Sequence, residues 1–288
     1  MSGLIYLNGI LLDAQEAAIP VTDRAYLYGE GLFETMKATQ GVIPFLPEHL
    51  DRFFLSLPVL DFKPSITRAE LEHAVYQTLR QNHLQEAYLR LQLSRENAAF
   101  GGLQAADRYN LLIVAQPLNN EMDEFRGKGM AAVLFPDHPV QAHPLSGVKS
   151  THYALNLRAK AYAKKQNAQE AIFADLKGNL VEGASSNLFI WNGRSWITPA
   201  LSSGALPGVM RRVLLSLMKA RNIPCEERGL SSDELAKAHE AILTNAIWEI
   251  MPLIRWEVQS IGTGQVGEKT SELQKWLADE IRSRASLL

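Results

Sequence analysis

The sequence predicts a mixed α/β fold of the α+β type, divided into two domains. Segments with the two-residue alternation of strands and segments with helical spacing occur both before and after a polar, glycine-bearing stretch at Pro117–Gly129. A length of 288 residues is sufficient for two modest domains. We therefore expect a small N-terminal α/β domain at 1–117, a linker at 118–128, and a larger, β-rich C-terminal domain with helices at 129–288.

Turn dipeptides and apolar spacing divide the N-terminal domain into hairpins and two helices. Asn8-Gly9 is a strong signal for a tight hairpin turn, and Gln40-Gly41 divides a second pair of alternating segments. Pro47 suits the first turn of a helix, and the run after Arg68 places its apolar residues on one helical face. The expected strands are 4–7, 10–12, 32–38, 42–45, 87–93 and 110–115, and the expected helices are 47–57 and 68–82.

In the C-terminal domain, strand-like runs again alternate with helical spacing. Asn192-Gly193 predicts a further hairpin turn after a strand. The expected strands are 131–135, 170–175, 187–191 and 240–244, and the expected helices are 152–166, 208–220, 231–236 and 272–283.

Composition narrows the functional classes. The net charge of −2 and the pI near 6.4 come from interspersed acidic and basic residues, so we expect no surface for nucleic acid or for a membrane. Cys225 is the single cysteine and cannot form an internal disulfide, which fits a reducing compartment. The amino terminus lacks the regions of a signal peptide, and no apolar run approaches about 18 residues. These features predict a soluble, cytoplasmic protein.

Two short stretches carry most of the chemical information. Ser-Gly-Val-Lys-Ser-Thr at 146–151 places Lys149 between a loop and a helix-patterned run, and Leu-Val-Glu-Gly-Ala-Ser-Ser-Asn at 180–187 places Glu182 between two strand-like runs. A lysine amine and a carboxylate held by rigid elements suit an enzyme that uses pyridoxal 5'-phosphate (PLP). The amine forms a Schiff base with the cofactor, and the carboxylate keeps the ring nitrogen protonated. Taken alone, Lys149 is typical of a solvated surface charge and Glu182 of a turn residue.

Three further motifs make this pairing specific: Tyr-Leu-Tyr-Gly-Glu-Gly-Leu-Phe-Glu at 26–34, Glu-His-Leu-Asp-Arg at 48–52, and Ala-Leu-Pro-Gly-Val-Met-Arg at 205–211. With these motifs the chain resembles the class IV aminotransferases, which have PLP fold type IV. That family includes branched-chain aminotransferases, D-amino-acid aminotransferases and aminodeoxychorismate lyases. The motifs follow the family's order from about residue 20 to residue 252, so the resemblance covers nearly the whole chain.

The resemblance implies a set of cofactor contacts. It makes Lys149 the Schiff-base lysine, which also moves a proton between the substrate Cα and the cofactor C4′, and it makes Glu182 the partner of the ring nitrogen. Arg52 is assigned to the phosphate, although its spacing from Glu48 also suits a surface ion pair. The other predicted contacts are the helix-start residues Gly208, Val209 and Met210, the ring contacts Tyr153 and Leu206, and Ser185, Ser186, Asn245 and Ala246. The two serines equally suit turn hydrogen bonds.

For the substrate, alternation places Tyr88 and Arg90 on one face of a strand, where a buried arginine needs an anion such as a substrate carboxylate. This Tyr-x-Arg pair resembles branched-chain aminotransferases, whereas Arg95 resembles an arginine of the lyases. The Arg-x-His carboxylate site typical of the best-known D-amino-acid enzymes is missing, because Glu96–Gly102 occupies that region. The other predicted substrate contacts are Tyr28, Phe33 and Ile247.

The motifs divide between two reactions. Glu34, the Tyr-x-Arg pair and Ala-Leu-Pro-Gly favour a transaminase that moves an amino group from a branched-chain-like amino acid to a 2-oxo acid. Met210 and Ala246 stand where aminotransferases of the family often have threonine, and with Arg95 they favour an aminodeoxychorismate lyase, which yields 4-aminobenzoate and pyruvate in folate synthesis. We expect the transaminase, with the lyase as the alternative and a non-catalytic PLP-binding dimer as a third interpretation.

The resemblance also implies the partners of the chain. It predicts small amino and oxo acids as substrates, and a homodimer in which Tyr28 and neighbouring loops reach toward the partner's active site. The histidines show no paired ligand spacing, so we expect no metal site.

Overall fold

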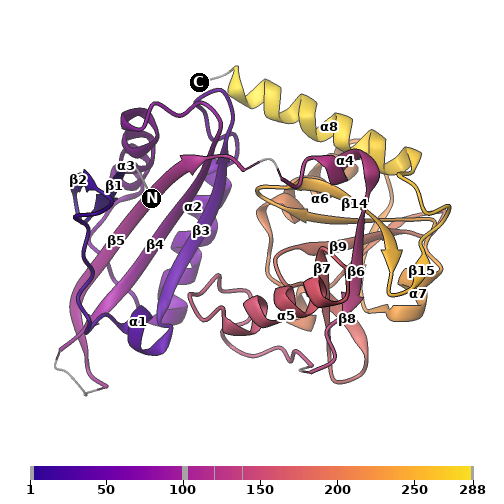
Figure 1. Ribbon diagram of the computed structural model, residues 1–288, viewed down its shortest axis with the longest axis horizontal. Coiled ribbons are helices and arrows are strands. Elements are labelled where there is room, and N and C mark those ends of the chain that lie inside the picture. Colours follow the sequence, from indigo (N-terminus) through magenta and orange to yellow (C-terminus); the bar gives the residue numbers. More distant parts are fainter. Residues whose placement is uncertain (1–2, 99–102, 120, 138, 287–288) are drawn as a thin grey trace. The chain divides into compact units, whose positions relative to one another are not determined.

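The computed structural model describes residues 3–98, 103–119, 121–137 and 139–286 (Figure 1). The chain forms two compact units. Unit 1 comprises Met1–Asn119, Val148–Tyr153 and Arg284–Leu288, and unit 2 comprises Asn120–Gly147 and Ala154–Ser283. Each unit contains a sheet and helices, which confirms the mixed α/β class. Part of the Glu96–Gly102 segment, residues 99–102, lies outside the described ranges.

The described part of unit 1 is built on a five-stranded antiparallel sheet in the order β2-β1-β5-β4-β3 (Figure 1). Its strands are β1 (Leu4–Leu7), β2 (Ile10–Asp13), β3 (Gly31–Ala38), β4 (Ala87–Asn97) and β5 (Ala105–Pro117). Its helices are α1 (Arg24–Tyr28), α2 (Leu46–Ser56), the short 3-10 helix η1 (Leu57–Leu60) and α3 (Arg68–Gln81). The order places β3 at an edge, where main-chain groups remain available to another segment.

One face of this sheet packs against α2 and α3. In β4, the odd-numbered residues from Ala87 to Leu93 are buried in a core with side chains of both helices, including Phe53 and Leu79. Tyr88, Arg90 and Gln92 alternate with them and are half-buried. Because successive strand residues point to opposite faces, these three side chains lie on the other face of the sheet. The shared face expected for Tyr88 and Arg90 is therefore confirmed.

The strand expected at 42–45 does not form. Val42 makes only a bridge to Thr39 among the described pairings, and α2 begins at Leu46. Pro44 has no N–H to donate to a strand ladder, and the neighbouring Ile43 is buried in the core. Helix α1 is an element that the sequence did not indicate, and β4 and β5 both extend beyond their expected ranges.

The described part of unit 2 is built on a ten-stranded sheet in the order β11-β10-β9-β13-β14-β6-β7-β8-β12, with β15 paired to β14. The strands are β6 (Met130–Leu134), β7 (Glu170–Ala174), β8 (Asn179–Gly183), β9 (Asn187–Trp191), β10 (Trp196–Pro199), β11 (Cys225–Arg228), β12 (Leu230–Ser231), β13 (Glu240–Asn245), β14 (Glu249–Trp256) and β15 (Gln259–Ser260). The helices are α4 (Glu124–Lys128), α5 (Ala154–Lys165), the 3-10 helix η2 (Leu201–Ser203), α6 (Val209–Ala220), α7 (Ser232–Ala236) and α8 (Glu268–Ala285).

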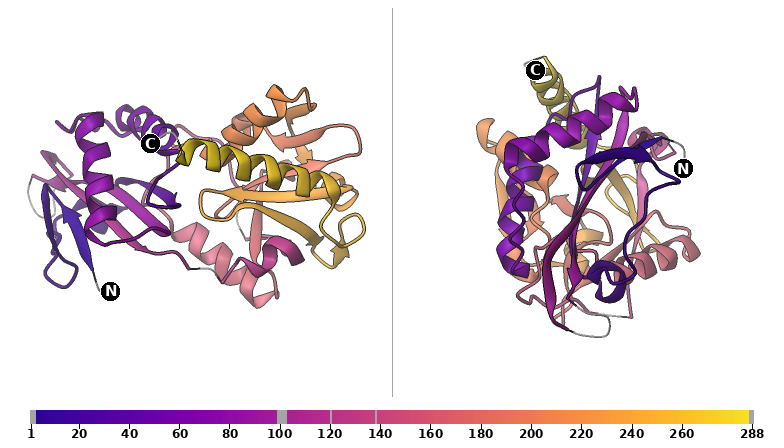
Figure 2. Two further views of the ribbon diagram at one scale, coloured as in Figure 1. Left: turned by 90° about the horizontal axis from the view of Figure 1, so that it is seen from above. Right: turned by 90° about the vertical axis from the view of Figure 1, so that its left-hand side faces the viewer.

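Strands β6 and β7 of unit 2 are buried on both faces. Ala132 and Ile172 pack into one apolar core, whereas Val133 and Phe173 pack into a second core with Ala159 of α5. Figure 2 shows α5 and α6 on opposite sides of unit 2. Strands covered on both faces need apolar residues at successive positions, which explains why Met130–Leu134 reads as a continuous apolar run.

Strands β8, β10, β11, β12, β14 and β15 of unit 2 lie outside the strand ranges expected from the sequence. Glu182 lies within β8, not between strands as the sequence suggested. Strand β14 contains Pro252, a residue that is usually confined to edge strands, strand starts and bulges. Its pairing with β6 begins at Leu253, after the proline, and shifts register between Leu253 and Arg255.

Three further properties bear on function. Within the described ranges, none of the helices has both the length and the apolar character needed to cross a membrane. The same residues contain no group of three or more His, Cys, Asp or Glu side chains that could hold a metal ion. Cys225 is partly buried on β11, and this burial raises the pKa of its thiol to about 11.

Candidate active site

Strand β3 holds the segment that contains Lys149. The N–H of Phe33 donates to the Lys149 carbonyl at 2.9 Å, and the N–H of Thr151 donates to the Gly31 carbonyl at 2.9 Å. Leu32 and Ser150 form an antiparallel bridge between these two hydrogen bonds. The Lys149 backbone is therefore added to the edge of the unit 1 sheet by main-chain hydrogen bonds, which restrict where its side chain can reach.

Two glycines of the 26–34 motif allow this close approach. A Cβ on Gly31 would lie 2.9 Å from Thr151 Oγ1 and 3.0 Å from the Leu93 carbonyl oxygen. Gly29 ends α1 in the left-handed region with φ of 72°, and its carbonyl accepts a 2.7 Å hydrogen bond from the Thr151 hydroxyl. The glycines are thus explained by the position of the Lys149 segment.

Three of the predicted site residues, Lys149, Arg90 and Tyr153, contact the Phe33 ring. The Lys149 amine lies 4.4 Å from the ring centre, and the Arg90 guanidinium carbon lies 3.9 Å from it. Tyr153 meets the same ring edge-on, with centres 5.6 Å apart. Phe33 itself is buried, with 4% exposure. The structure therefore brings together Lys149, Tyr153, Phe33 and Arg90, and two cationic groups at one ring suit an anionic ligand.

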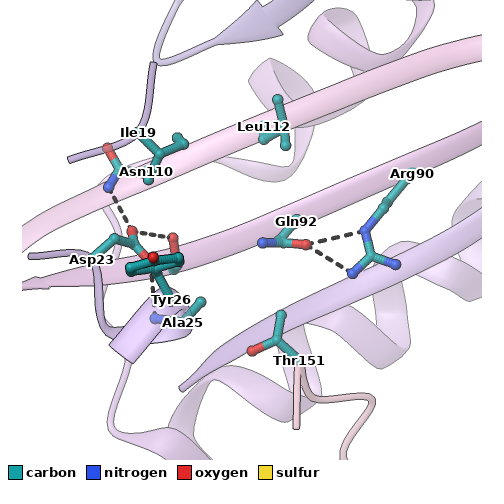
Figure 3. Close-up of a pocket in the computed structure, with 10 residues that line it drawn as sticks. Ile19, Asp23, Ala25, Tyr26, Arg90, Gln92, Asn110, Leu112 and Thr151 are labelled. Atoms are coloured by element: carbon teal, nitrogen blue, oxygen red, sulfur yellow. Dashed lines mark hydrogen bonds between the residues drawn. The ribbon is translucent and has the colours of Figure 1, made fainter. Parts of the chain in front are cut away.

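Arg90 faces a cavity of about 370 Å³ on the side of the sheet away from α2 and α3. Gln92 accepts from Arg90 Nε at 3.1 Å and from a terminal guanidinium nitrogen at 2.8 Å (Figure 3). Tyr26, Leu112 and Thr151 also line this cavity. The amide of Gln92 therefore fixes the orientation of the guanidinium within a cavity that has both polar and apolar walls.

The polar end of the same cavity is formed around Asp23. This residue is 1% exposed and accepts hydrogen bonds from the Ser94 hydroxyl at 2.6 Å and the Asn110 amide at 2.7 Å. It also accepts from the Ala25 N–H at 2.8 Å as the N-cap of α1 (Figure 3). These donors hold the Asp23 carboxylate in place, so Asp23 forms a fixed part of the cavity wall. The sequence did not indicate this role.

The structure separates Arg95 from Arg90. Arg95 lies over Phe62, 5.1 Å from the ring centre, and Phe62 belongs to the core that packs against the helices. A terminal guanidinium nitrogen of Arg95 donates to Glu30 at 2.9 Å, and Glu30 also binds Arg24. Arg90 and Arg95 thus lie on opposite faces of β4, as their odd separation requires. Tyr28 is 44% exposed and stacks under the Arg24 guanidinium.

The carboxylate that binds Arg52 is Glu34. Arg52 Nε donates to Glu34 Oε1 at 2.7 Å, and a terminal guanidinium nitrogen donates to Oε2 at 2.6 Å. His49 Nδ1 lies 2.7 Å from the same Oε2. All three side chains are buried, and Glu34 is 1% exposed. The predicted phosphate ligand is therefore held in a fixed plane by a bidentate ion pair, which the local spacing to Glu48 could not indicate.

The charges in this cluster are set by burial and by neighbouring groups. Burial alone raises the pKa of Glu34, but the Arg52 charge and the hydrogen bonds from Arg52 and His49 outweigh it and lower this pKa to about 2. Burial lowers the pKa of His49, and the charges of Arg52 and Lys149 act in the same direction against the Glu34 hydrogen bond. At neutral pH, Glu34 is ionised and a neutral His49 donates its Nδ1–H to it.

In unit 2, Glu182 is tied to Leu206. Glu182 Oε2 accepts from the Leu206 N–H at 3.0 Å and from the Asn187 side-chain amide at 3.2 Å. The same Asn187 amide donates to the Leu206 carbonyl at 3.0 Å. The structure therefore brings two predicted cofactor contacts together through Asn187, the last residue of the 180–187 motif, for which the sequence indicates no role.

The start of α6 offers main-chain donors. Gly208 is its N-cap and supplies no side-chain hydrogen bond to the first turn. A Cβ on Gly208 would lie 2.0 Å from Asn187 Oδ1, so only glycine fits there. The apolar side chains of Val209 and Met210 are buried, with 4% and 2% exposure. Their backbone N–H groups, in the first turn of α6, are therefore the groups that could donate hydrogen bonds to an anion.

The remaining predicted contacts form a polar network. The hydroxyls of Ser185 and Ser186 both donate to Glu170, a buried residue that sequence reasoning missed. A hydroxyl has one hydrogen, so these two donors are committed to Glu170 of β7, and neither hydroxyl donates the turn hydrogen bond considered for the serines. The Asn245 side chain accepts from the backbone N–H of Ile247, with Ala246 between them. The sequence signal that could have identified Glu170 is its position as a charged residue at the start of the otherwise apolar run Glu170–Ala174.

We expect Gly31→Ala to displace the Lys149 segment, because the added methyl group meets both Thr151 and the Leu93 backbone. Hydrogen–deuterium exchange of the Phe33 and Thr151 amides should become faster. Gly127→Ala is the matched control, since a Cβ there meets nothing within 4 Å. Unchanged exchange of the two amides in Gly31→Ala would contradict the description of β3 as the anchor of Lys149.

Comparison with known proteins assigns the family. The model of the family described as "Amino-transferase class IV" matches residues 31–256. A Methanocaldococcus jannaschii protein, provisionally named a branched-chain-amino-acid aminotransferase, is 32% identical over 277 residues, which cover 96% of this chain and 95% of that protein. The aminodeoxychorismate lyase of Bacillus subtilis (strain 168) is 29% identical over 283 residues, which cover 97% and 95% of the two chains.

The fold gives the same assignment. The crystal structure of the branched-chain amino acid aminotransferase of Escherichia coli matches with a TM-score of 0.90 and 26% sequence identity, and the match covers 96% of this chain and 93% of that chain. The family match spans the segments that hold Glu34, Lys149, Glu182 and Gly208. The chain belongs to the class IV aminotransferases, with the fold type IV and the PLP dependence of that family.

Proposed function

We propose that this enzyme is a transaminase that takes an amino group from a branched-chain-like amino acid and gives it to a 2-oxo acid. The observation that carries the proposal is the arrangement at Phe33, where the Lys149 amine and the Arg90 guanidinium lie 4.4 and 3.9 Å from one ring centre. An amino acid substrate needs an amine that can take the proton from its Cα and a cation for its carboxylate. Apolar Phe33 and Leu112, and the branched-chain names of the Methanocaldococcus jannaschii and Escherichia coli proteins above, support an aliphatic side chain.

The residues present fit the chemical groups of PLP. When bound, PLP supplies an aldehyde that accepts the amino group and a ring that accepts electrons. Glu182 is a carboxylate oriented by Leu206 and Asn187, and it suits a protonated ring nitrogen. The first turn of α6, whose N-cap Gly208 makes no side-chain hydrogen bond, suits a phosphate, which binds well at helix N-termini.

Arg52 is the proposed cation for the same phosphate. Glu34 fixes the plane of its guanidinium through two hydrogen bonds of 2.7 and 2.6 Å. A guanidinium of fixed orientation loses less side-chain entropy when it binds an anion. Glu34 and His49 would therefore act through Arg52 and not on the reacting atoms.

The proton-transfer roles follow from these placements. Lys149, whose backbone is held on β3, is proposed to take the proton from the substrate Cα and to return it at the cofactor C4′. Glu182 holds a proton at the ring nitrogen. Tyr153, whose ring is packed edge-on against Phe33, is proposed to reach the cofactor's ring oxygen.

The position of Arg95 favours the transaminase over the lyase. The lyase needs a cation for the second carboxylate of aminodeoxychorismate, and Arg95 was the residue expected to supply it. Arg95 is instead bound to Glu30 on the face of β4 opposite Arg90. The lyase remains the second candidate because Met210 and Ala246 lack the hydroxyls found in many aminotransferases of the family.

Replacement of Lys149 and Glu182 tests the cofactor roles. Lys149→Ala should abolish turnover and the visible absorption of the bound cofactor, while far-ultraviolet circular dichroism stays that of the folded protein. Glu182→Gln should keep the absorption but slow exchange of the substrate Cα hydrogen with solvent by orders of magnitude, because an unprotonated ring accepts electrons poorly. Wild-type turnover in Lys149→Ala would show that the central assignment is wrong.

Replacement of the two arginines decides between the reactions. Arg90→Ala should weaken the single-turnover reaction with every aliphatic amino donor by a similar factor, equivalent to about 2–5 kcal/mol for a lost charged partner in a pocket. Arg95→Ala is the matched control, since such donors offer it no second carboxylate. Rapid release of 4-aminobenzoate from aminodeoxychorismate, with no reaction of any amino acid, would establish the lyase instead.

We further infer that the enzyme is a homodimer. The segment from Ile19 to Tyr28 carries exposed apolar and aromatic side chains, among them Val21 at 68% and Tyr26 at 77% exposure. Such a concentration on one short segment is typical of an interface. Val21→Asp with Tyr26→Asp should shift sedimentation toward the monomer, whereas Leu55→Asp, at an equally exposed leucine of α2, should not. A wild-type monomer with full activity would contradict the proposal.

A further inference from the structure

Glu170 is the most deeply buried carboxylate that the proposed reaction does not use. It begins β7 in unit 2 and is 0% exposed. Burying a carboxylate is costly unless hydrogen bonds and charges replace its water. An apolar side chain would fill the same volume without this cost. The role of Glu170 is therefore inferred from the hydrogen bonds and the ion pair that its carboxylate makes.

Both oxygens of Glu170 are occupied by donors. Oε2 accepts from the hydroxyls of Ser185 and Ser186 at 2.8 and 3.0 Å, and from the Ser185 N–H at 3.3 Å. Oε1 accepts from the Ala171 N–H at 3.1 Å and lies 3.4 Å from the Lys160 amine. The carboxylate thus ties the loop that follows Glu182 to β7 and to helix α5.

The hydrogen-bond network of Glu170 extends to the Asn245–Trp248 turn, and from there back to Lys160. The Ser185 carbonyl accepts from the Asn245 side-chain amide at 3.1 Å. Asn245 Oδ1 in turn accepts from the N–H groups of Ile247 and Trp248 at 3.0 and 2.7 Å. The Trp248 ring lies 4.7 Å from the Lys160 amine, which brings the chain of contacts back to Glu170.

The packing around this closed circuit leaves little freedom. A Cβ on Gly183 would lie 2.3 Å from Ser186 Oγ and 3.0 Å from Glu170 Cγ. The Ala184 carbonyl accepts from Asn156 of α5 at 2.8 Å, and the Ala184 N–H donates to the Ala171 carbonyl at 2.8 Å. Buried polar networks in which every member is paired fix geometry more strongly than apolar contacts do.

We propose that Glu170 is a positioning residue that sets the Ser185–Asn187 loop and the Asn245–Trp248 turn against each other. Both segments contain residues proposed to contact the cofactor or the substrate, so this inference rests on the proposed function. Glu170 acts through Ser185, Asn245 and Lys160. Its effect on the cofactor is indirect. Glu170 accepts the hydrogen bonds of both serine hydroxyls, so the backbone of the Ser185–Asn187 loop and the Asn187 side chain are the groups of this loop that shape the site.

Glu170→Gln tests the proposal directly. The amide keeps the volume but places an NH2 group where only an acceptor fits, opposite either the serine hydroxyls or the Lys160 amine. Exchange of the Ile247 and Trp248 amides with deuterium should become faster in protein without added PLP. In the loaded enzyme, PLP should dissociate about tenfold to a hundredfold faster, and the visible circular dichroism of bound PLP should change.

Glu240→Gln is the matched control. Glu240, at the opposite end of β13 from Asn245, also accepts from two backbone N–H groups and a hydroxyl, those of Lys269 and Thr270. This variant should lower the melting temperature, but it should leave exchange at Ile247 and Trp248 and the dissociation of PLP unchanged. Equal effects of Glu170→Gln and Glu240→Gln on those readouts would mean that Glu170 has only a general stabilising role.

A second variant covers the case in which Glu170→Gln does not fold. Lys160 is 33% exposed in its side chain, so Lys160→Met should be tolerated while it removes the cation from both Glu170 and Trp248. Faster exchange at Trp248 supports the circuit, and wild-type exchange there overturns it. If exchange responds as proposed but the wild-type protein binds no PLP, the proposed function fails and the positioning role stands.

Discussion

The edge of strand β3 is the constraint on which the unit 1 site depends. Its main chain holds Lys149 through the hydrogen bonds at Phe33 and Gly31. Its side chains then serve both faces, because successive strand residues point in opposite directions. Phe33 supports the Lys149 amine and the Arg90 guanidinium on one face, while Glu34 holds Arg52 and His49 on the other. One short strand therefore organises three cationic groups.

Unit 2 holds its loops with two carboxylates, the partly buried Glu182 and the fully buried Glu170. Glu182 binds the Leu206 amide and Asn187, and Glu170 binds the serine loop. These two donors to Glu182 are neutral, whereas Glu170 receives neutral donors and also lies 3.4 Å from the Lys160 amine. The uncapped start of α6 lies next to the Asn187 contact and remains available for an anion.

The preference for transamination over lysis depends on which face of β4 each arginine occupies. Arg90 and Arg95 are both candidates for binding a carboxylate when the sequence is considered as a string. Their odd separation places Arg95 over Phe62 and beside Glu30, on the face that packs against the helices. Arg90 faces the cavity with Gln92. The two arginines therefore cannot clamp the same small substrate from one face of this strand.

Features that depend on neighbouring residues were predictable before the structure was known. The turn at Asn8-Gly9, the helix after Arg68, the alternation of Tyr88 and Arg90, and the motifs that indicate the family were all readable from neighbouring residues. Local patterns also misled: Pro44 prevented a strand where alternation suggested one, and Pro252 was tolerated within β14. Only the tertiary structure decided that Glu34 pairs with Arg52, that Lys149 joins the edge of β3, and that Glu170 connects two loops. These contacts join residues from 15 positions apart, Glu170 and Ser185, to more than a hundred, Phe33 and Lys149, and no spacing rule for one helix or strand reaches that far.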